Sequence, residues 1–292
     1  KAALEAAGPL LGEEHVPRVV RYDGREHALL MTCAPEDAVP WKQRLMAGEF
    51  GGGAAATAGQ LLGRLHARSA AMEAELRGAF EDLKFFEQLR LDPFYRHVQR
   101  RYPELDRPVG VLIGQLAEER TCLVHGDYSP KNMLTAPAGR LIVLDYEVAH
   151  WGNPVFDLAF CTAHLMLKGF ALGREADAAD LAAAFLNGYA SGAGGGIDAG
   201  GGGSPHSDGQ SSQAGGLSPH FGGLLPHLGM MLLARMDGKS PVEYIADEAM
   251  KERIRRIGIE WVSSAGEAPG SRDDVLHRIR EEGFGLEERE SA

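Results

Sequence analysis

Hydrophobic residues near the start of the chain form two short runs that predict a β-hairpin. Residues 16–22 and 27–32 are rich in valine, leucine and other apolar side chains, with polar residues between and around them. Asp23-Gly24 separates the two runs, and an Asp-Gly pair is a strong signal for a tight hairpin turn. We therefore expect two antiparallel strands here.

Helical spacing of the apolar residues dominates most of the remaining chain. In residues 53–79, for example, Leu61, Leu65 and Met72 fall on one face of a helix that the three glycines at 51–53 open. Helices are predicted at residues 1–12 (broken at Gly8-Pro9), 41–46, 53–79, 80–105 (restarting at Asp92-Pro93), 109–120, 154–167, 221–236, 241–257 (with Ser240 as the N-cap) and 272–282. The pattern therefore predicts a mainly helical protein with a few short strands.

One segment, residues 191–219, follows neither pattern. It is rich in glycine and serine and contains almost no apolar residues. Such a composition cannot bury enough surface to offset the entropy lost on ordering, which predicts a disordered insertion between helices. No strand precedes its glycines and no Lys-Ser or Lys-Thr pair follows them, so they do not form a phosphate-binding loop.

A second predicted hairpin carries polar residues at its open end. Residues 133–135 and 140–144 flank the turn at 136–139, with Asn132 directly before the first strand and Asp145 directly after the second. Because the two strands of a hairpin are antiparallel, the residues at its open end lie side by side. The sequence therefore predicts that Asn132 and Asp145 meet.

Asp127 adds a third polar group to this corner. It lies in the turn His125-Gly126-Asp127, five positions before Asn132, after a short apolar strand. Amide and carboxylate oxygens are ligands for Mg²⁺ at about 2.1 Å, together with waters and substrate phosphates. An acid that accepts a hydroxyl proton beside a metal-binding Asn and Asp is the set of groups used in phosphoryl transfer.

Three motifs in this order resemble the aminoglycoside phosphotransferase family. They are His125-Gly126-Asp127 with Asn132 five positions on, Leu144-Asp145-Tyr146-Glu147, and Trp151-Gly152-Asn153-Pro154 followed by Asp157-Leu158-Ala159. The likeness covers residues 14–170 and, more loosely, 220–260. It implies an α+β, protein-kinase-like fold with an incomplete small β lobe at residues 1–33 and a mostly helical large lobe at residues 34–292. Asn153 departs from the Asp often found there.

The resemblance also implies roles for individual residues. Asp127 would be the catalytic residue that orients the acceptor hydroxyl and can take its proton. Asn132 and Asp145 would bind the metal, while Glu147 would either bind a second Mg²⁺ or remain a solvated acid. His125 and Asp157 would support the backbone of the catalytic loop, as the matching protein-kinase residues do.

The nucleotide site is only partly represented. The resemblance places adenine beside the segment after the first hairpin, with Met31, Thr32 and Cys33 as cofactor-binding residues. The glycine-rich loop and strand lysine of the family precede this segment and are not visible. Because the chain opens on Lys1, we expect an N-terminally truncated sequence.

The composition of the chain argues against some kinds of binding partner and cellular location. The net charge of −11 argues against nucleic acid and against an anionic membrane surface. Three scattered cysteines, Cys33, Cys122 and Cys161, show no disulfide or metal spacing, which favours a reducing, cytoplasmic location. The most apolar candidate for a membrane span, Phe221 to Met236, is interrupted by polar residues, so no membrane span is expected.

The sequence therefore predicts a Mg²⁺-dependent phosphotransferase that moves the γ-phosphoryl group of ATP, or GTP, to a hydroxyl of a small molecule such as an aminoglycoside-like antibiotic or a metabolite. Two alternatives stay open. One is a kinase of the same fold that acts on choline, ethanolamine or a sugar. The other is a non-catalytic pseudokinase or an inactive fragment.

Overall fold

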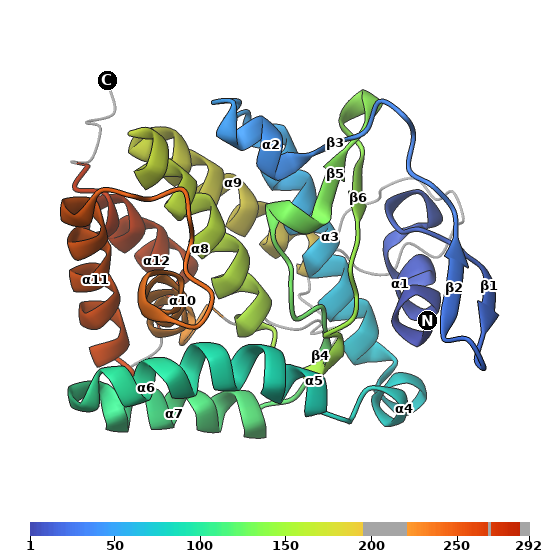
Figure 1. Ribbon diagram of the computed structural model, residues 1–292, viewed down its shortest axis with the longest axis horizontal. Helices are drawn as coiled ribbons and strands as arrows, with labels where there is room; N and C mark the ends of the chain where they lie inside the picture. The colour runs from blue at the N-terminus through green and yellow to red at the C-terminus, as the bar shows by residue number, and fades with distance from the viewer. Residues whose placement is uncertain (195–220, 268–269, 287–292) are drawn as a thin grey trace, which may run out of the picture.

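The computed structural model describes residues 1–194, 221–267 and 270–286, and it has a mixed α+β architecture. Figure 1 shows α1 (Ala2–Leu11), β1 (Val19–Asp23) and β2 (Ala28–Met31) at one end of the molecule, near the N-terminus. Most of the helices gather at the other end. The expected combination of a small β part with a mostly helical part is confirmed, whereas the boundary between residues 33 and 34 stays a prediction.

The first hairpin forms as predicted. β1 and β2 pair antiparallel, and the Asp23 side chain accepts hydrogen bonds from the backbone of Arg25 and Glu26 in the turn. Helix α1 precedes them and runs through Gly8-Pro9, so the break expected at this pair is wrong. Proline removes only one backbone donor, and α1 still buries the apolar face formed by Ala3, Ala7, Leu10 and Leu11.

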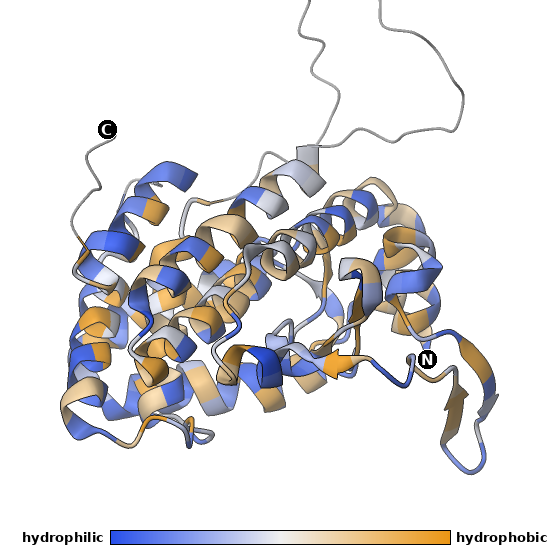
Figure 2. Ribbon diagram, turned by 90° about the horizontal axis from the view of Figure 1, so that it is seen from above, coloured by the Kyte–Doolittle hydropathy of each residue, from blue (hydrophilic) through white to orange (hydrophobic). Residues whose placement is uncertain are grey.

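The hairpin itself is exposed. Val20 and Leu30 expose 52% and 58% of their surface, and Tyr22 and Met31 are also open to solvent. In Figure 2 the two strands project from the body of the protein and carry hydrophobic colour.

Two further small sheets build the centre of the molecule. One has the order β3 (Val39–Pro40), β5 (Met133–Thr135), β6 (Leu141–Val143), and the other pairs β4 (Cys122–Val124) with β7 (His150–Gly152). All neighbouring strands are antiparallel. The second predicted hairpin, β5–β6, is therefore confirmed. Its turn contains Ala138 and Gly139, both with positive φ (60° and 73°).

Helices make up the rest of the large part. They are α2 (Trp41–Met46), α3 (Gly52–Ala71), α4 (Glu73–Leu76), α5 (Lys84–Phe86), α6 (His97–Arg101), α7 (Asp106–Glu118), α8 (Val155–Leu172), α9 (Glu175–Gly194), α10 (Leu224–Asp237), α11 (Glu248–Ser263) and α12 (Arg272–Arg278). Short 3₁₀ turns lie at Glu13–His15, Arg77–Ala79, Pro103–Leu105, Pro130–Asn132 and Pro137–Gly139, and π-helical turns at Glu87–Arg96 and Ile279–Gly283.

Two helix boundaries differ from the predictions because of local backbone chemistry. The chain does not restart at Asp92-Pro93; it passes through Pro93 in the π-helical turn Glu87–Arg96, a geometry found where a helix accommodates an irregularity. Helix α11 begins after Asp247 rather than after Ser240. The Asp247 carboxylate accepts hydrogen bonds from the backbone of Ala249 and Met250, which makes it the N-cap.

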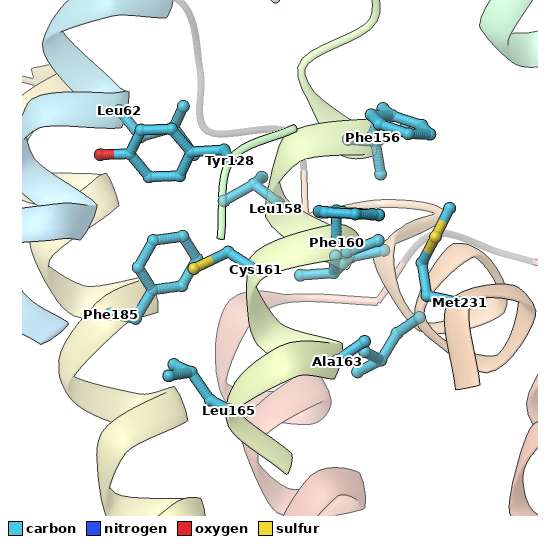
Figure 3. Packing of buried hydrophobic residues seen from close by; sticks show 14 of the residues in the cluster. Leu62, Tyr128, Phe156, Leu158, Phe160, Cys161, Ala163, Leu165, Phe185 and Met231 are labelled. Carbon is cyan, nitrogen blue, oxygen red and sulfur yellow. The ribbon is translucent and has the colours of Figure 1, made fainter. Parts of the chain in front are cut away.

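Helix α8 is the centre of the core. Every residue from Val155 to Phe170 is buried, and Figure 3 shows its side chains packed between Phe185 of α9 and Met231 of α10. This is also the described helix that is long and apolar enough to cross a membrane, but 89% of it is buried inside the protein. The expectation that Phe221 to Met236 is the most apolar candidate is wrong, because α8 is longer and its charged side chains are few.

Helices α3 and α9 approach each other to backbone contact through glycines. A Cβ on Gly63 would lie 2.4 Å from the Tyr189 carbonyl oxygen, and one on Gly188 would lie 2.3 Å from the Ala56 carbonyl oxygen. Neither distance is possible for a real side chain, so glycine is required on both helices. Residues 191–194 of the glycine-rich segment belong to α9, and the predicted disorder at 195–219 lies outside the described residues.

Candidate active site

The open end of the β5–β6 hairpin brings the predicted metal-binding residues to adjacent positions. Met133 pairs with Val143, and the Leu144 backbone N–H then donates to the Asn132 carbonyl oxygen over 2.9 Å. Asp145 follows Leu144 directly, beyond the end of β6. The structure therefore places Asp145 next to the residue that is hydrogen-bonded to Asn132, while the sharing of one metal ion by the two side chains stays a prediction.

Asp127 is joined directly to Asn132. The Asn132 amide nitrogen donates to the Asp127 carbonyl oxygen over 3.0 Å and to the carboxylate oxygen Oδ2 over 2.7 Å. Because both partners are acceptors, the amide NH₂ must face Asp127, and the amide oxygen Oδ1 remains available for a cation. Asp127 is 6% exposed, so its carboxylate is held in a fixed orientation.

Arg90 is a site residue that the sequence motifs did not reveal. Its guanidinium lies 2.9 Å from Asp127 Oδ1, and its Nε donates to the Gly126 carbonyl oxygen over 2.6 Å. It comes from the π-helical turn Glu87–Arg96, far from the catalytic loop in sequence. The only sequence signal was a basic residue within an apolar helical pattern, which gives no indication of its partner.

His125 connects the loop to the second strand of the hairpin. Its Nδ1 accepts from the Asp127 backbone N–H over 3.1 Å, so Nε2 carries the proton and donates to the Leu144 carbonyl oxygen over 3.0 Å. Burial lowers the pKa of His125, which agrees with this neutral form. The ring therefore ties the turn of Asp127 to the residue before Asp145, which is the supporting position expected for it.

Asp157, in the first turn of α8, holds the backbone of the same turn. Its carboxylate accepts the N–H of His125 over 2.7 Å and the N–H of Gly126 over 2.9 Å, and His66 Nε2 lies 3.3 Å away. Burial alone would raise the pKa of Asp157, but the hydrogen bonds donated by the His66 ring and by the His125 backbone outweigh it and lower the pKa. Asp157 is fully buried and makes the supporting contacts predicted for it.

Gly126 is required by both space and backbone geometry. Its φ is +79°, and a Cβ there would lie 2.7 Å from the Val148 carbonyl oxygen. The tight turn can therefore present Asp127 only with glycine at this position.

The Asp145 carboxylate is the second candidate metal ligand. Its φ is +67°, a left-handed conformation that aspartate tolerates better than most residues. The residue is exposed, and among the described residues no hydrogen bond or ion pair joins its carboxylate. Together with the available Asn132 oxygen, this set of hard oxygen donors fits Mg²⁺. Within the described ranges, no cluster of three His, Cys, Asp or Glu side chains could hold a metal without other ligands.

A cavity of about 990 Å³ opens beside Asp127. Its lining contains Asp127, Ser129, Lys131 and Glu147, together with residues of the turn Glu87–Arg96, of α2, α8 and α10, and of the segment 239–244. Its volume suits a small organic molecule. Glu147 thus shares a cavity with Asp127, while its predicted metal contact stays a prediction.

The predicted cofactor-binding residues lie elsewhere. Met31 ends β2, Thr32 exchanges hydrogen bonds with the backbone of Arg18, and Cys33 is exposed. None of the three lines the cavity that contains Asp127. Their adenine contact stays a prediction.

The mixed α+β fold and this loop are those of a phosphotransferase. The family model of the phosphotransferase enzyme family, APH, matches residues 2–197. The chain belongs to this family, which confirms the resemblance drawn from its motifs. No curated protein sequence matches the chain.

Two solved structures illustrate the fold. A choline/ethanolamine kinase family protein from Mesorhizobium loti aligns with a TM-score of 0.44 and 14% identity, over 97% of this chain and 76% of that chain. A glucosamine kinase aligns with a TM-score of 0.43 and 18% identity, over 94% of this chain and 66% of that chain. These similarities are too low to indicate an acceptor.

Proposed function

We propose that the protein transfers the γ-phosphoryl group of ATP, with Mg²⁺, to a hydroxyl group of a small molecule. The observation that carries the proposal is the double hydrogen bond from the Asn132 amide to Asp127, next to the register that sets Asp145 beside Asn132. One side of this corner offers oxygen ligands, and the other offers a carboxylate at the edge of a cavity.

Asp127 orients the acceptor hydroxyl. Its two carboxylate oxygens are fixed by Arg90 and Asn132 and keep further lone pairs for a hydroxyl donor. In the reaction the acceptor oxygen bonds to phosphorus, the bond from phosphorus to the bridging oxygen of ADP breaks, and the hydroxyl proton passes toward Asp127 or solvent. Mg²⁺ held by Asn132 and Asp145 would neutralise charge on the transferred group.

The proposal is tested by ADP release from Mg²⁺-ATP in the full natural protein, with aminoglycosides, macrolides, choline and sugars as acceptors. Asp127→Asn should lower kcat by about 10²–10⁴-fold, the range for a positioned acid–base group. Asp145→Asn should weaken the binding of Mg²⁺ and lower kcat with it, because a charged metal ligand is lost. Asparagine also tolerates the left-handed backbone at position 145, so the variant should fold. Asp273→Asn, an exposed change of the same kind on α12, is the matched control.

Two results would count against the proposal. Magnesium-dependent nucleotide binding that survives Asp145→Asn, measured by calorimetry, would contradict the metal assignment. An ADP signal that is equal in wild type and Asp127→Asn would favour the pseudokinase alternative.

A further inference from the structure

The cavity beside Asp127 is more basic than the protein as a whole. Its basic lining residues are Lys42, Arg90, Lys131, Arg235 and Lys239, against the acidic residues Asp127, Glu147 and Glu243. The whole chain has the opposite balance, with a net charge of −11. A local excess of cations on an acidic protein marks the cavity as a place where negative charge is favoured.

Some of these cations already have carboxylate partners. Arg90 and Lys131 lie 2.9 and 3.6 Å from the Asp127 carboxylate, and Lys239 lies 2.7 Å from Asp92. These pairs do not call for a ligand.

The two remaining lining cations, Lys42 of α2 and Arg235 of α10, and the buried Lys168 of α8, which is not part of the lining, form a group that we name the cationic wall. In the part of the chain that the structure describes, none of them forms an ion pair. Lys42 Nζ and Lys168 Nζ lie 5.8 and 5.7 Å from the centre of the Tyr244 ring, which lines the cavity. Within the described ranges, the buried Lys168 ammonium donates a single hydrogen bond, to the His164 carbonyl oxygen over 2.9 Å.

Two hydrogen-bonding atoms close to these cations, one on Arg235 and one on Tyr244, have no partner among the described residues. Arg235 Nε and Tyr244 Oη are also shielded from solvent. Buried polar groups in folded proteins nearly always have partners. Both residues line the cavity through their other atoms, so an anion bound there would lie beside the Arg235 guanidinium, whose charge has no counter-ion in the described residues.

His164 lies close to several of these positive charges. Its ring lines the cavity, and burial together with the charges of Lys168, Arg235, Lys131 and Lys42 lowers its pKa. His164 is therefore neutral and does not offset the negative charge of a ligand. Two acids besides Asp127 line the cavity. Glu147 lies two residues from Asp145, on the proposed metal side, and Glu243 directly precedes Tyr244 in sequence.

We propose that the acceptor carries an anionic group, a carboxylate or a phosphate, which binds Lys42 and Arg235 while its hydroxyl lies at Asp127. This inference rests on the proposed phosphotransferase function and narrows its substrate class. A cationic aminoglycoside or choline would instead meet like charges in this cavity.

The test uses six-carbon acceptors that differ mainly in charge. Glucosamine, glucose, gluconate and glucose 6-phosphate supply a cation, a neutral molecule, a carboxylate and a phosphate, with kanamycin and choline as further cations. ADP release is measured in the full natural protein against the Asp127→Asn background. We expect gluconate or glucose 6-phosphate to exceed the neutral and cationic compounds at least about tenfold in kcat/KM, as expected when a desolvated charge pair is made or lost.

Arg235→Gln connects this preference to the wall. It should raise KM for the anionic acceptor about tenfold, because one charged contact is lost, with little change in KM for ATP. Arg77→Gln, an exposed change of the same kind between α4 and α5, should leave both values unchanged. Higher kcat/KM for kanamycin, choline or glucosamine, or an Arg235→Gln effect confined to ATP, would overturn the proposal.

A binding measurement separates failure of this inference from failure of the proposed function. Inorganic phosphate is titrated calorimetrically into the full natural protein without nucleotide. Weaker phosphate binding in Arg235→Gln than in wild type and Arg77→Gln supports the anion site even if no acceptor releases ADP. Equal binding in all three proteins overturns the anion site, whatever the ADP assay shows.

Discussion

The catalytic loop and two residues of the cationic wall, Lys42 and Arg235, line the same cavity, but the loop and the wall differ in how their charges are balanced. In the loop, the Asp127 carboxylate and the side chains of His125 and Asp157 all have hydrogen-bond partners. In the wall, Lys168 and Arg235 are like charges without a counter-ion among the described residues, and Arg235 Nε makes no hydrogen bond. The charges of the loop are therefore paired in the free protein. The unpaired cations of the wall lower the stability of the fold, and a bound anion would reduce this loss.

Asp157 provides the largest expected effect on the loop side. Asp157→Asn keeps the size of the side chain but replaces one acceptor oxygen by a donor, so one of the N–H groups of His125 or Gly126 loses its partner. Removing one member of a buried charged network costs about 3–5 kcal/mol. Urea unfolding at pH 7 should show this loss of stability, and ADP release should fall with it.

The pH dependence of the same variant identifies the cause. The folded-state pKa of Asp157 is lowered, so its ionised form contributes stability above the ordinary pKa near 3.8, and this contribution is lost as the pH falls through the folded-state value. The stability difference between wild type and Asp157→Asn should therefore shrink in acid. A difference that stays constant from pH 7 to acid would contradict a role for the charge.

Replacing Lys168 in the wall should stabilise the protein, in contrast to the loss of stability expected for Asp157→Asn. Burial, with the charges of Lys42 and Arg235, lowers the pKa of Lys168 from 10.5 to about 7. Lys168→Met fills the same space without a charge and should raise the free energy of unfolding at pH 6 by a few kcal/mol, at about 1.4 kcal/mol per pKa unit. The same variant should bind inorganic phosphate more weakly.

The sign follows from proton binding. Between pH 7 and 10.5 the unfolded chain binds a proton at Lys168 that the folded protein lacks, so wild-type stability rises with pH. The advantage of Lys168→Met is therefore full below pH 7 and declines toward pH 10. Lys84→Met, an exposed change on α5, is the control and should show no such trend. An advantage that is independent of pH would mean that packing, not charge, sets the difference.

The same contrast explains how much could be predicted from the sequence. Asp127, Asn132 and Asp145 lie within nineteen consecutive residues, 127–145, and a hairpin register fixes how they meet. Lys42, Lys168 and Arg235 come from three separate helices. Hydrophobic periodicity assigns a residue to a helix but does not show which helices meet, so the wall had no sequence pattern. The one available signal was Lys168 within an otherwise apolar helix.

Some of the predicted helix boundaries are wrong because of the local sequence around them. Pro9 and Pro93 were expected to interrupt helices, but packing of the apolar face carries α1 and the turn Glu87–Arg96 past them. Asp247 was overlooked as an N-cap because Ser240-Pro241 offers a similar signal seven residues earlier.

A smaller effect is expected from a change in the packing of α3 against α9, which tests whether this packing helps to position the catalytic loop. Gly63→Ala would press a methyl group against the Tyr189 carbonyl oxygen, and overpacking of this kind costs about 1–3 kcal/mol. His66 lies one turn further along α3 and contacts both Asp157 and Tyr189, so ADP release should also fall. Gly114→Ala in α7, where a Cβ meets no atom within 4 Å, should instead stabilise by about 0.5–1 kcal/mol. Equal effects of the two changes in unfolding measurements would show that α3 can shift freely.

The smallest effect is expected from an exposed cation at the rim of the cavity. Lys239 lines the cavity, but its side chain is 51% exposed and pairs with Asp92, which is 41% exposed. Solvent and salt screen such a pair strongly. Lys239→Gln should therefore change KM for an anionic acceptor by less than about twofold, against the tenfold change expected for Arg235→Gln. If the two variants weaken acceptor binding equally at 0.15 M salt, the anion is attracted by the general charge of the cavity mouth, and Arg235 has no special role.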